Sequence, residues 1–288
     1  YYTLVAENHS RFTKLWFYWF SKLVYHCADH IILTAEYISD FVQKTFHIPK
    51  NKISVCPNYI DTELFSPKEP PEKINKRILF IGRLSQEKNL FSLIEACKNA
   101  GVGLDLAGEG TLHEELNDFS KKVNADTIFL GVLPNSQMPS LIAKYPVFIL
   151  PSFYEGNPKA ILEVMSCQRA VIGSDVGGIR EVISEGKNGI ICGTKTEEIS
   201  SAIKRLIDDQ QLQLKLGKNA REYVLKNANI NKAIDEIKRV AKKDAFFVFT
   251  LLKRSKKFKT IKKILEKNFN LEEFDEGKDL ILFGKLID

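Results

Sequence analysis

Apolar runs and helix-like segments alternate along the middle of the chain. From Arg77 onward, short runs rich in Ile, Leu, Val and Phe are separated by segments whose apolar residues recur at helical spacing. The apolar runs are continuous, which is typical of parallel strands that helices cover on both faces. The pattern therefore predicts an α/β fold, a doubly wound Rossmann-like domain with its ligands at the carboxyl ends of the strands. The expected strands are residues 78–82, 103–107, 127–130, 147–150, 170–173 and 189–192.

The segments on either side of this domain follow other patterns. Residues 1–65 combine a helix-like aromatic stretch with a strand-like run at 28–34, and a polar, Pro-rich segment at 66–76 follows them. Such a segment holds neither period, so we expect a linker there, part of one domain before it and the doubly wound domain at 77–228. In the remainder, 229–288, we expect a helix and then a βαββ unit, with a strand at 246–251, a helix at 261–269 and a hairpin at 271–285.

Composition narrows the class of protein. With 288 residues, 44% of them hydrophobic and 27% charged, the chain can bury a sizeable core and is globular. Its five cysteines are odd in number and mostly inside apolar runs, which suits buried thiols in a reducing compartment, so we expect a cytoplasmic protein. The chain offers neither the ~18 apolar residues of a membrane span nor a signal pattern. Because it also starts without Met, we expect it to begin within a longer protein.

The charge of the chain is modestly positive. A net charge of +6 suits anionic ligands without identifying one. Much of the excess lies at 253–263, where a solvated loop and helix face is a better explanation than a nucleic-acid patch. The aromatic stretch at 16–20, flanked by Arg11, Lys14 and Lys22, could touch a membrane peripherally. Because it is aromatic nearly all round and not amphipathic, the sequence favours an interior helix.

The loop after the fourth expected strand carries the first candidate site. This loop brings Glu155 and Gly156 to Asn157, which we expect to cap a helix that starts with Pro158. The unpaired N–H groups of the first turn, near residues 159–161, face the carboxyl edge of the sheet and favour a phosphate. Gly156 would let the backbone approach that ligand closely.

Glu163 lies about one and a half turns into the same helix, among apolar neighbours. A carboxylate in such surroundings is costly unless it meets hydrogen-bond donors. A ribose is one candidate, since the two oxygens of a carboxylate can accept from two vicinal hydroxyls. A structural pairing with Arg180 is the alternative.

Two basic residues follow the first strand of the domain. Arg83 comes just after the strand, and Lys88 arrives five residues later, at the expected start of the next helix. Both can meet one diphosphate, each charge-assisted hydrogen bond contributing about 1.5–3 kcal/mol. Basic residues on a surface loop are the alternative. That alternative loses weight because glycine-rich turns at 108–110 and 177–178 end strands on the same edge.

Taken in order, these residues resemble the motifs of glycosyltransferase family 4, over residues 1 to about 228. The matching set is Arg83 with Lys88, residues 108–110, 129–131 and 151–152, Glu155 with Glu163, and residues 177–181. The resemblance implies a GT-B architecture, in which two Rossmann-like domains face each other and the second binds a nucleotide diphosphate sugar. Residues 1–65 would then be a remnant of the first, acceptor-side domain, so the resemblance also implies an incomplete chain.

The resemblance implies a role for each matching residue. Arg83 and Lys88 would bind the diphosphate, Glu163 the ribose, Glu155 with Gly156 and Asn157 the transferred sugar, and Val132 with Leu133 the base. The full set of implied donor contacts is Arg83, Lys88, Gly108, Val132, Leu133, Glu155, Gly156, Asn157, Lys159, Ala160, Ile161 and Glu163, and the implied catalytic residues are Glu155, Arg83, Lys88 and His9.

Two matches in the N-terminal segment depart from the family. His9 lies in a stretch like the family's Glu-His-Asn, with the last two residues exchanged, and is either a cleft residue or an ordinary loop histidine. Residues 57–61 match the interdomain segment, with Tyr59 in place of the usual glycine.

The implied reaction is transfer with retention at the anomeric carbon, by attack on the face from which the diphosphate leaves. No metal and no cofactor are expected, the donor is a UDP- or GDP-sugar, and the acceptor is a glycan or a lipid-linked sugar in polysaccharide, lipopolysaccharide or glycolipid synthesis. A glycosidase is excluded, because hydrolysis needs both carboxylates at one anomeric centre, whereas the helix aims Glu155 and Glu163 at different parts of the ligand.

Alternatives remain open for the activity and for the tail. A non-catalytic nucleotide-sugar-binding fragment would bind a donor without transfer, and a GT-B epimerase would release isomerised sugar. Residues 244–288 resemble the closing β-α-β-β of a class I S-adenosylmethionine methyltransferase without its cofactor loop; a simple embellishment is the alternative.

Overall fold

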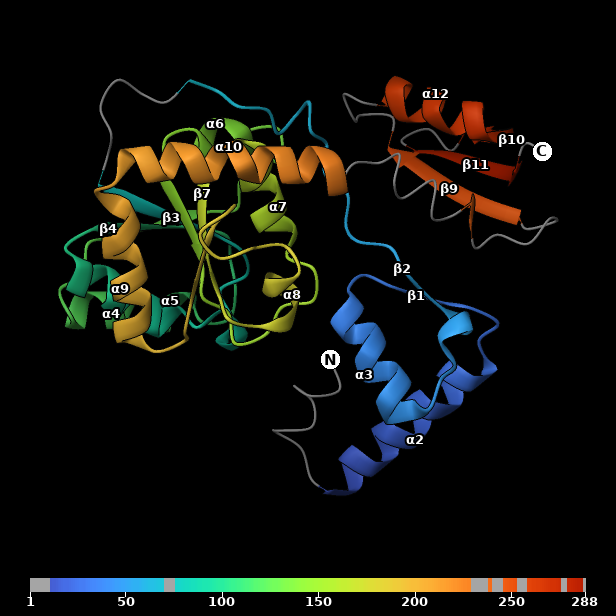
Figure 1. Cartoon of the computed structure of the whole chain (residues 1–288), viewed down its shortest axis with the longest axis horizontal. Helices are drawn as coiled ribbons and strands as arrows, with labels where there is room; N and C mark the ends of the chain where they lie inside the picture. Colours follow the sequence, from blue (N-terminus) through green and yellow to red (C-terminus); the bar gives the residue numbers. More distant parts are fainter. Residues whose placement is uncertain are drawn as a thin grey trace. The chain divides into compact units, whose positions relative to one another are not determined.

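The computed structural model describes residues 11–69, 76–228, 238–239, 246–252, 258–275 and 279–286. The chain folds into two compact units, Tyr1–Ala233 and Ile234–Asp288 (Figure 1). The first unit contains the N-terminal segment together with the doubly wound domain. The predicted division between them at 66–76 stays a prediction.

A parallel sheet of six strands, in the order β5-β4-β3-β6-β7-β8, forms the centre of the first unit (Figure 1). The chain runs outward from β3 to β5, returns to the other side of β3 and runs outward again through β6, β7 and β8. Between β3 and β6 the strand order reverses, and there a doubly wound sheet opens a crevice. The predicted Rossmann-like α/β domain is confirmed, with strands β3 (Arg77–Ile81), β4 (Gly103–Ala107), β5 (Thr127–Gly131), β6 (Val147–Leu150), β7 (Ala170–Ser174) and β8 (Ile190–Cys192).

The burial of the strands explains the continuous apolar runs. Ile78, Leu79 and Phe80 follow one another in β3, and all three are fully buried although successive side chains point to opposite faces. Both faces of the sheet are therefore covered. The helices and short turn of this domain are η2 (Gln86–Lys88), α4 (Leu90–Ala100), α5 (His113–Lys122), α6 (Met138–Ile142), α7 (Lys159–Ser166), α8 (Gly177–Arg180), α9 (Thr196–Ile207) and α10 (Gln210–Asn227).

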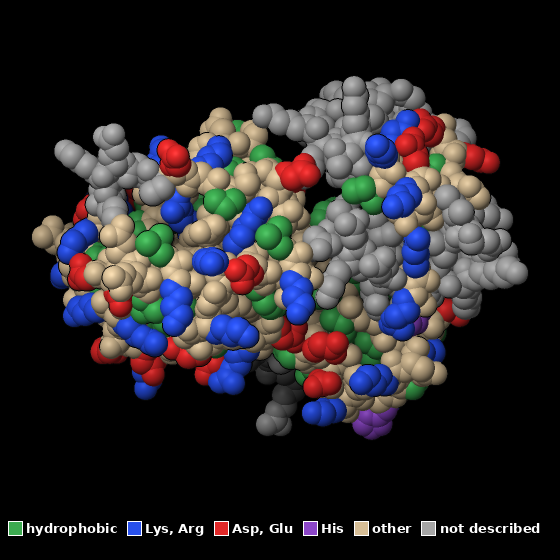
Figure 2. All heavy atoms as spheres, turned by 45° about the horizontal axis from the view of Figure 1, so that its top comes forward, with side chains coloured by type: hydrophobic (Ala, Val, Ile, Leu, Met, Phe, Trp, Pro, Cys, Tyr) green, Lys and Arg blue, Asp and Glu red, His purple; other side chains and the backbone are tan. Residues whose placement is uncertain are grey.

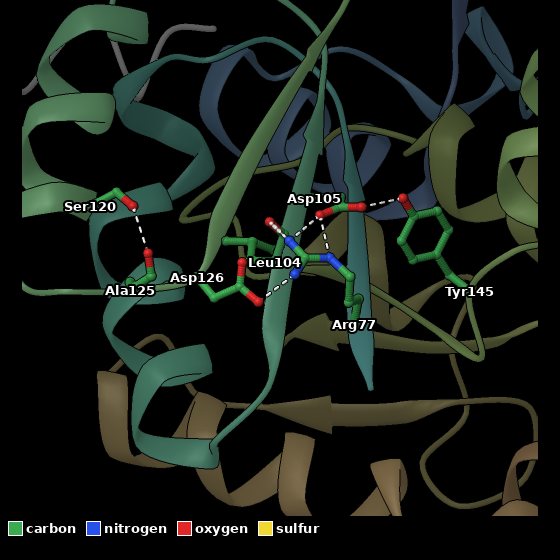
Figure 3. A network of polar contacts seen from close by, with 7 residues as sticks. All are labelled: Arg77, Leu104, Asp105, Ser120, Ala125, Asp126 and Tyr145. Carbon is green, nitrogen blue, oxygen red and sulfur yellow. Dashed lines mark hydrogen bonds and ion pairs between the residues drawn. The ribbon is translucent and has the colours of Figure 1, made fainter. Parts of the chain in front are cut away.

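A polar network holds the amino ends of β3 and β4, at the edge opposite the predicted site (Figure 3). The Nε of Arg77 donates to Oδ1 of the buried Asp105 over 2.8 Å, and its guanidinium also pairs with Asp126. Tyr145 donates to the other carboxylate oxygen of Asp105. Burial alone would lower the pKa of Arg77, but its hydrogen bonds with Asp105 and Asp126 raise it, so the guanidinium stays charged. This network stabilises the fold and does not reach the predicted site.

The N-terminal segment forms a smaller α/β layer. Helix α2 (Arg11–Cys27) comes first and is followed by β1 (Ile31–Leu33). Helix α3 (Glu36–Phe46) then connects β1 to β2 (Ile53–Val55), which pairs with β1 in parallel. The short turn η1 (Lys50–Lys52) precedes β2. A separate core holds this segment together, formed by Ile31, Val42, Phe46, Ile48 and Ile53.

Helix α2 is not the interior helix that the sequence favoured for the aromatic stretch at 16–20. Its Tyr18 and Tyr25 lie against Phe46, with ring centroids 5.4 and 5.1 Å apart. The opposite face is exposed, and Trp16, Trp19 and Phe20 keep 54%, 58% and 51% of their surface accessible. The prediction was wrong because aromatic residues occupy both faces of the helix, while the described part of the chain packs against one of them.

The second unit is the predicted βαββ arrangement. Strands β9 (Phe246–Leu252), β11 (Asp279–Leu286) and β10 (Phe269–Asp275) form an antiparallel sheet in the order β10-β11-β9. Helix α12 (Phe258–Asn268) connects β9 to β10, and its Leu265 is buried. The element positions confirm the sequence prediction, whereas the resemblance to the end of a methyltransferase stays a prediction.

The described surface mixes charges of both signs. Lys and Arg side chains are interspersed with Asp and Glu side chains over the face in Figure 2. No described helix is both long and apolar enough to cross a bilayer. Three of the cysteines, Cys97, Cys167 and Cys192, are buried as expected, and Cys27 is exposed.

Candidate active site

Lys88 and Glu155 meet at the crevice between the carboxyl ends of β3 and β6. The Nζ of Lys88 lies 2.6 Å from Oε1 of Glu155, and their side chains are 17% and 11% exposed. The hydroxyl of the buried Ser152 donates to the same oxygen over 2.6 Å. Lys88, predicted to bind the diphosphate, and Glu155, predicted to bind the sugar, thus form one charge-assisted cluster that solvent reaches poorly.

Asn89 fixes the relative position of the two loops that carry this pair. It adopts a left-handed backbone, with φ of 56°, where η2 passes into α4. Its buried side-chain amide donates to the carbonyls of Pro151 and Thr194 over 3.2 and 2.8 Å. The N–H of Phe153 donates to the carbonyl of Glu87 over 2.8 Å. Lys88 therefore lies in the short turn before α4, not at the start of that helix as predicted.

The helix after the loop begins one residue later than expected, and Asn157 does not cap it. Helix α7 starts at Lys159, with Pro158 at the capping position and no side-chain cap. The Oδ1 of Asn157 accepts from the N–H of Asn58 over 3.0 Å, and the Nδ2 of Asn58 donates to the Asn157 carbonyl over 2.7 Å. A partner 99 residues away has displaced the local cap. The first turn of α7, with the N–H groups that a helix start leaves without intrahelical partners, still adjoins the cluster, because Lys159 and Ala160 line the same hollow as Lys88 and Glu155.

Two adjoining hollows extend on either side of Arg83. One is lined by Arg83, Lys88, Glu155, Lys159 and Ala160. The other is lined by Arg83, Gly108, Val132, Leu133 and Met138. Arg83 is exposed and lines both, together with Ile81 and Gly82, so positive charge lies at the middle of one elongated site.

Gly108 allows the turns after β3 and β4 to approach each other. Its φ is 141°, and a Cβ atom there would lie 1.9 Å from the carbonyl oxygen of Gly82. Because the clash is with backbone, no side chain could move to relieve it. Gly156 is different: the nearest atom to a Cβ would be Ile38 Cδ1 at 3.8 Å, so protein packing does not require glycine at this position.

Glu163 is a buried carboxylate with a weak partner. It is 8% exposed, and the Nζ of Lys159 lies 3.9 Å from its Oε1, the long end of an ion pair. Burial raises the pKa of Glu163, and the charge of Lys159 counteracts this only in part. The structural alternative for Glu163 was wrong, because Arg180 pairs with Asp175, its NH2 donating to Asp175 Oδ2 over 2.6 Å.

Some predicted site residues lie apart from the cluster. The side chain of Ile161 is fully buried in the core, so only its backbone N–H is available to a ligand. His9 lies outside the described residues. Residues that the sequence interpretation missed are Asn89, Tyr37 and Asn58, and their contacts join segments far apart in the chain, for which no local pattern exists.

This geometry defines a class of protein. Two cations, Arg83 and Lys88, and a helix start at the switch point of a doubly wound sheet form an anion site, and the second hollow extends it past Arg83. The chain belongs to the Glycosyl transferases group 1 family, whose model matches residues 61–223, and the Glycosyltransferase Family 4 model matches residues 2–64. The GT-B assignment made from the motifs is thereby confirmed.

Curated relatives carry the same family name. An uncharacterized glycosyltransferase of Methanocaldococcus jannaschii is 28% identical over 207 residues, 71% of this chain and 57% of the relative. The UDP-Gal:alpha-D-GlcNAc-diphosphoundecaprenol alpha-1,3-galactosyltransferase of Escherichia coli is 26% identical over 244 residues, 78% of this chain and 63% of the relative. The chain thus spans about 60% of the length of these relatives.

Solved structures share the fold. Sucrose-phosphate synthase from Thermosynechococcus elongatus matches 77% of this chain and 60% of its own, with a TM-score of 0.70 and 21% identity. Anabaena HepE, solved in complex with UDP-glucose, matches 74% of this chain and 63% of its own, with a TM-score of 0.64 and 21% identity. The isolated C-terminal domain of Francisella tularensis LpcC matches 59% of this chain and 99% of its own, with a TM-score of 0.52 and 23% identity.

Proposed function

We propose that this protein transfers a sugar, with retention of anomeric configuration, from a nucleotide diphosphate sugar to a glycan or lipid-linked acceptor. The observation that supports this most directly is the elongated site with Arg83 at its middle and the Lys88–Glu155 pair on one side. The family relationship adds independent support.

Each part of the donor would meet chemistry that suits it. The diphosphate would bind Arg83, Lys88 and the N–H groups of Lys159, Ala160 and Ile161. The base would lie against Val132 and Leu133, which line the hollow formed by Gly108. Glu163 would accept hydrogen bonds from the ribose hydroxyls, because among the described residues the cation that pairs with its carboxylate, Lys159, is 3.9 Å away. The sugar would meet the loop of Glu155, Gly156 and Asn157.

The proposed transfer breaks the bond between the anomeric carbon and the diphosphate oxygen and forms a bond to the acceptor oxygen on the same face. The acceptor proton passes to the departing diphosphate oxygen. Negative charge grows on that oxygen in the transition state, so Arg83, Lys88 and the α7 N–H groups stabilise it more strongly there than in the ground state. These groups need no metal for this step, and we expect none. His9 would serve the acceptor side.

The relatives favour a uridine donor and a lipid-linked acceptor. The name of the Escherichia coli relative specifies UDP-galactose and a diphosphoundecaprenol-linked sugar, and HepE was solved with UDP-glucose. For this chain, UDP over GDP and a lipid-linked glycan over other acceptors are therefore proposals. We also propose that the protein is cytoplasmic and acts in polysaccharide or glycolipid synthesis.

The exposed face of α2 suits contact with a membrane, where a lipid-linked acceptor would lie. Trp16, Trp19 and Phe20 lie on it, and the ammonium of Lys22 lies 5.3 Å from the Trp19 ring centroid. Aromatic rings next to a cation suit the interface of an anionic bilayer. Co-flotation with vesicles of phosphatidylglycerol, reduced by the paired change Trp16→Ala and Trp19→Ala, would support a peripheral contact, and no co-flotation of the unaltered protein would refute it.

Calorimetry with the whole chain tests the donor site. We expect UDP to bind with higher affinity than GDP, and one of UDP-glucose, UDP-galactose and UDP-N-acetylglucosamine to bind more tightly than UDP. Transfer of a radiolabelled sugar to undecaprenyl-linked oligosaccharides then tests catalysis. Failure of every nucleotide to bind would refute the proposed function, whereas binding without transfer would favour the nucleotide-sugar-binding alternative.

A further inference from the structure

Helix α3 begins without a cap of its own. Its capping position is Ala35, which has an extended backbone, with φ of −152° and ψ of 143°, and a methyl side chain that cannot accept a hydrogen bond. The first N–H groups of a helix need partners from outside it. The N–H of Glu36 and that of Tyr37 donate to Oε2 and Oε1 of Glu181 over 3.0 and 2.6 Å. A carboxylate from the donor-binding domain thus caps a helix of the N-terminal segment, where the helix dipole favours negative charge.

Glu181 is held in place for this contact. It directly follows α8, and its own carbonyl accepts from the hydroxyl of Tyr223 in α10 over 2.9 Å. Burial, followed by the charge of Glu181, raises the pKa of Tyr223, so that hydroxyl remains a donor. The backbone of the capping residue is therefore anchored to α10.

Tyr37 extends the contact to the proposed sugar loop. Its hydroxyl donates to the backbone carbonyl of Glu155 over 2.5 Å. Burial and hydrogen bonding with Tyr154 raise the pKa of Tyr37, and the charges of Glu181 and Glu155 add to the effect. The phenol therefore stays protonated and donates to Glu155, the residue whose carboxylate pairs with Lys88.

Two glycines allow α8 to lie close to both Tyr37 and the sugar loop. A Cβ atom at Gly177 would lie 2.7 Å from the ring of Tyr37. A Cβ atom at Gly178 would lie 2.0 Å from the carbonyl oxygen of Gly156 and 2.3 Å from that of Glu155. Together with the double hydrogen bond between Asn58 and Asn157, these contacts fix the loop at both of its ends.

We propose that Glu181 is a positioning residue: by capping α3 it holds Tyr37 on the carbonyl of Glu155, and so couples the seating of α3 to the shape of the sugar loop. This inference rests on the proposed function, because it takes Glu155 as the sugar ligand. Loss of the contact should loosen the loop around the sugar and leave the nucleotide part of the site, on the far side of Lys88, unchanged.

Three variants separate positioning from simple helix capping. Glu181→Ala removes the cap of α3 and its connection to α8. Adding Ala35→Ser to it supplies a small, neutral local cap at a fully buried position with an extended backbone, and should restore helix stability without the connection to α8. Tyr37→Phe removes the hydroxyl that bonds to Glu155 and Tyr154 but keeps the ring and the cap of α3. Glu222→Ala, an exposed glutamate of α10, is the matched control.

The measurements are dissociation constants for UDP and for the tightest-binding UDP-sugar, with the thermal midpoint of each variant. We expect Glu181→Ala and Tyr37→Phe to weaken the UDP-sugar about three- to tenfold, the effect of one net hydrogen bond, and to change UDP less than twofold. In the variant that also carries Ala35→Ser, the thermal midpoint should recover while sugar affinity stays low. Recovery of both together would overturn the inference in favour of a purely structural cap.

Hydrogen exchange at residues 152–158 tests the coupling without any ligand. Faster exchange in Glu181→Ala and Tyr37→Phe, by about three- to tenfold and persisting in Glu181→Ala after Ala35→Ser is added, would support it. Unchanged exchange in both would overturn the inference even if UDP binds normally, which would leave the proposed function intact. Loss of nucleotide binding in the unaltered protein would instead refute the proposed function and leave the exchange result to decide the coupling.

Discussion

Replacing Lys88 with methionine should affect folding stability and nucleotide binding by separate amounts. The ammonium lies 2.6 Å from Glu155 Oε1, with side chains 17% and 11% exposed. Methionine keeps the chain length but leaves the carboxylate with Ser152 as its hydroxyl donor. Breaking a fully buried pair costs about 3–5 kcal/mol, and a charge-assisted hydrogen bond contributes about 1.5–3 kcal/mol. Since water reaches both side chains here, we expect about 2 kcal/mol.

That loss corresponds to a fall in the thermal midpoint of about 4–8 °C for a unit of this size. In a double-mutant cycle with Glu155→Gln, the two changes together should cost less than their sum by at least about 1 kcal/mol, because the second removes the unpaired carboxylate. Circular dichroism on heating measures these values. Lys204→Met, at an exposed position of α9, is the control and should lie within about 0.5 kcal/mol of the unaltered protein.

Binding of UDP supplies the independent readout. Loss of one charge-assisted phosphate contact predicts about a 10- to 150-fold weaker dissociation constant for Lys88→Met. Glu155→Gln should keep or slightly raise UDP affinity, because it frees the ammonium from its competitor, while the UDP-sugar loses affinity. An additive mutant cycle, together with UDP affinity in Lys88→Met within twofold of normal, would refute this account of the cluster.

Three further changes test other parts of the structure. Glu163→Gln should raise the thermal midpoint at pH 7.5 more than at pH 4. The raised pKa of Glu163 means that folding favours the protonated form of this carboxyl. Its contribution to stability is therefore present below its ordinary pKa of about 4.3 and is lost as pH rises through its folded pKa. The same variant should bind UDP at least tenfold more weakly, and equal midpoint changes at both pH values would contradict the assignment. Gly108→Ala should destabilise by about 1–3 kcal/mol through its backbone clash with Gly82, whereas Gly156→Ala should fold with nearly unchanged stability; comparable losses in urea titrations would be inconsistent with the packing. Arg77→Met should cost about 3–5 kcal/mol, because it strands the buried Asp105, yet leave the affinity of the remaining folded protein for UDP unchanged. A specific loss of UDP affinity in that variant would show that the network is not confined to the opposite edge of the sheet.

Much of the donor domain could be predicted because its information is local. The apolar runs around Ile78 and Val147 are continuous, and each became a buried strand within one residue of the expected bounds. Once two strands are parallel neighbours, the residues after their carboxyl ends must lie close together. The meeting of Lys88 with Glu155 follows from that rule, although the ion pair itself was not expected.

The parts that escaped prediction depend on contacts between distant segments. Asn157 has the sequence context of a helix cap, yet its side chain bonds to Asn58. Arg180 was the alternative partner considered for Glu163, but it pairs with Asp175, five residues away. The stretch at 16–20 of α2 is aromatic nearly all round, and the position of Phe46, which packs against Tyr18 and Tyr25, decides which face is buried. In each case a choice among local options was made by a neighbour that the linear sequence does not identify.

The Lys88–Glu155 pair has a consequence for selectivity among anions. Glu155 acts as an internal counter-ion, so any incoming anion must draw Lys88 away from a partner 2.6 Å distant. A small anion such as inorganic phosphate gains little beyond that single ammonium and must offset the whole cost of separating the pair. In the proposed complex, a nucleotide diphosphate sugar would also engage Arg83 and the N–H groups of α7, and its sugar hydroxyls would donate to the carboxylate that Lys88 leaves. The pair would thus set a binding threshold, which only a ligand that carries both a diphosphate and a polyol would pass without leaving a buried charge unpaired.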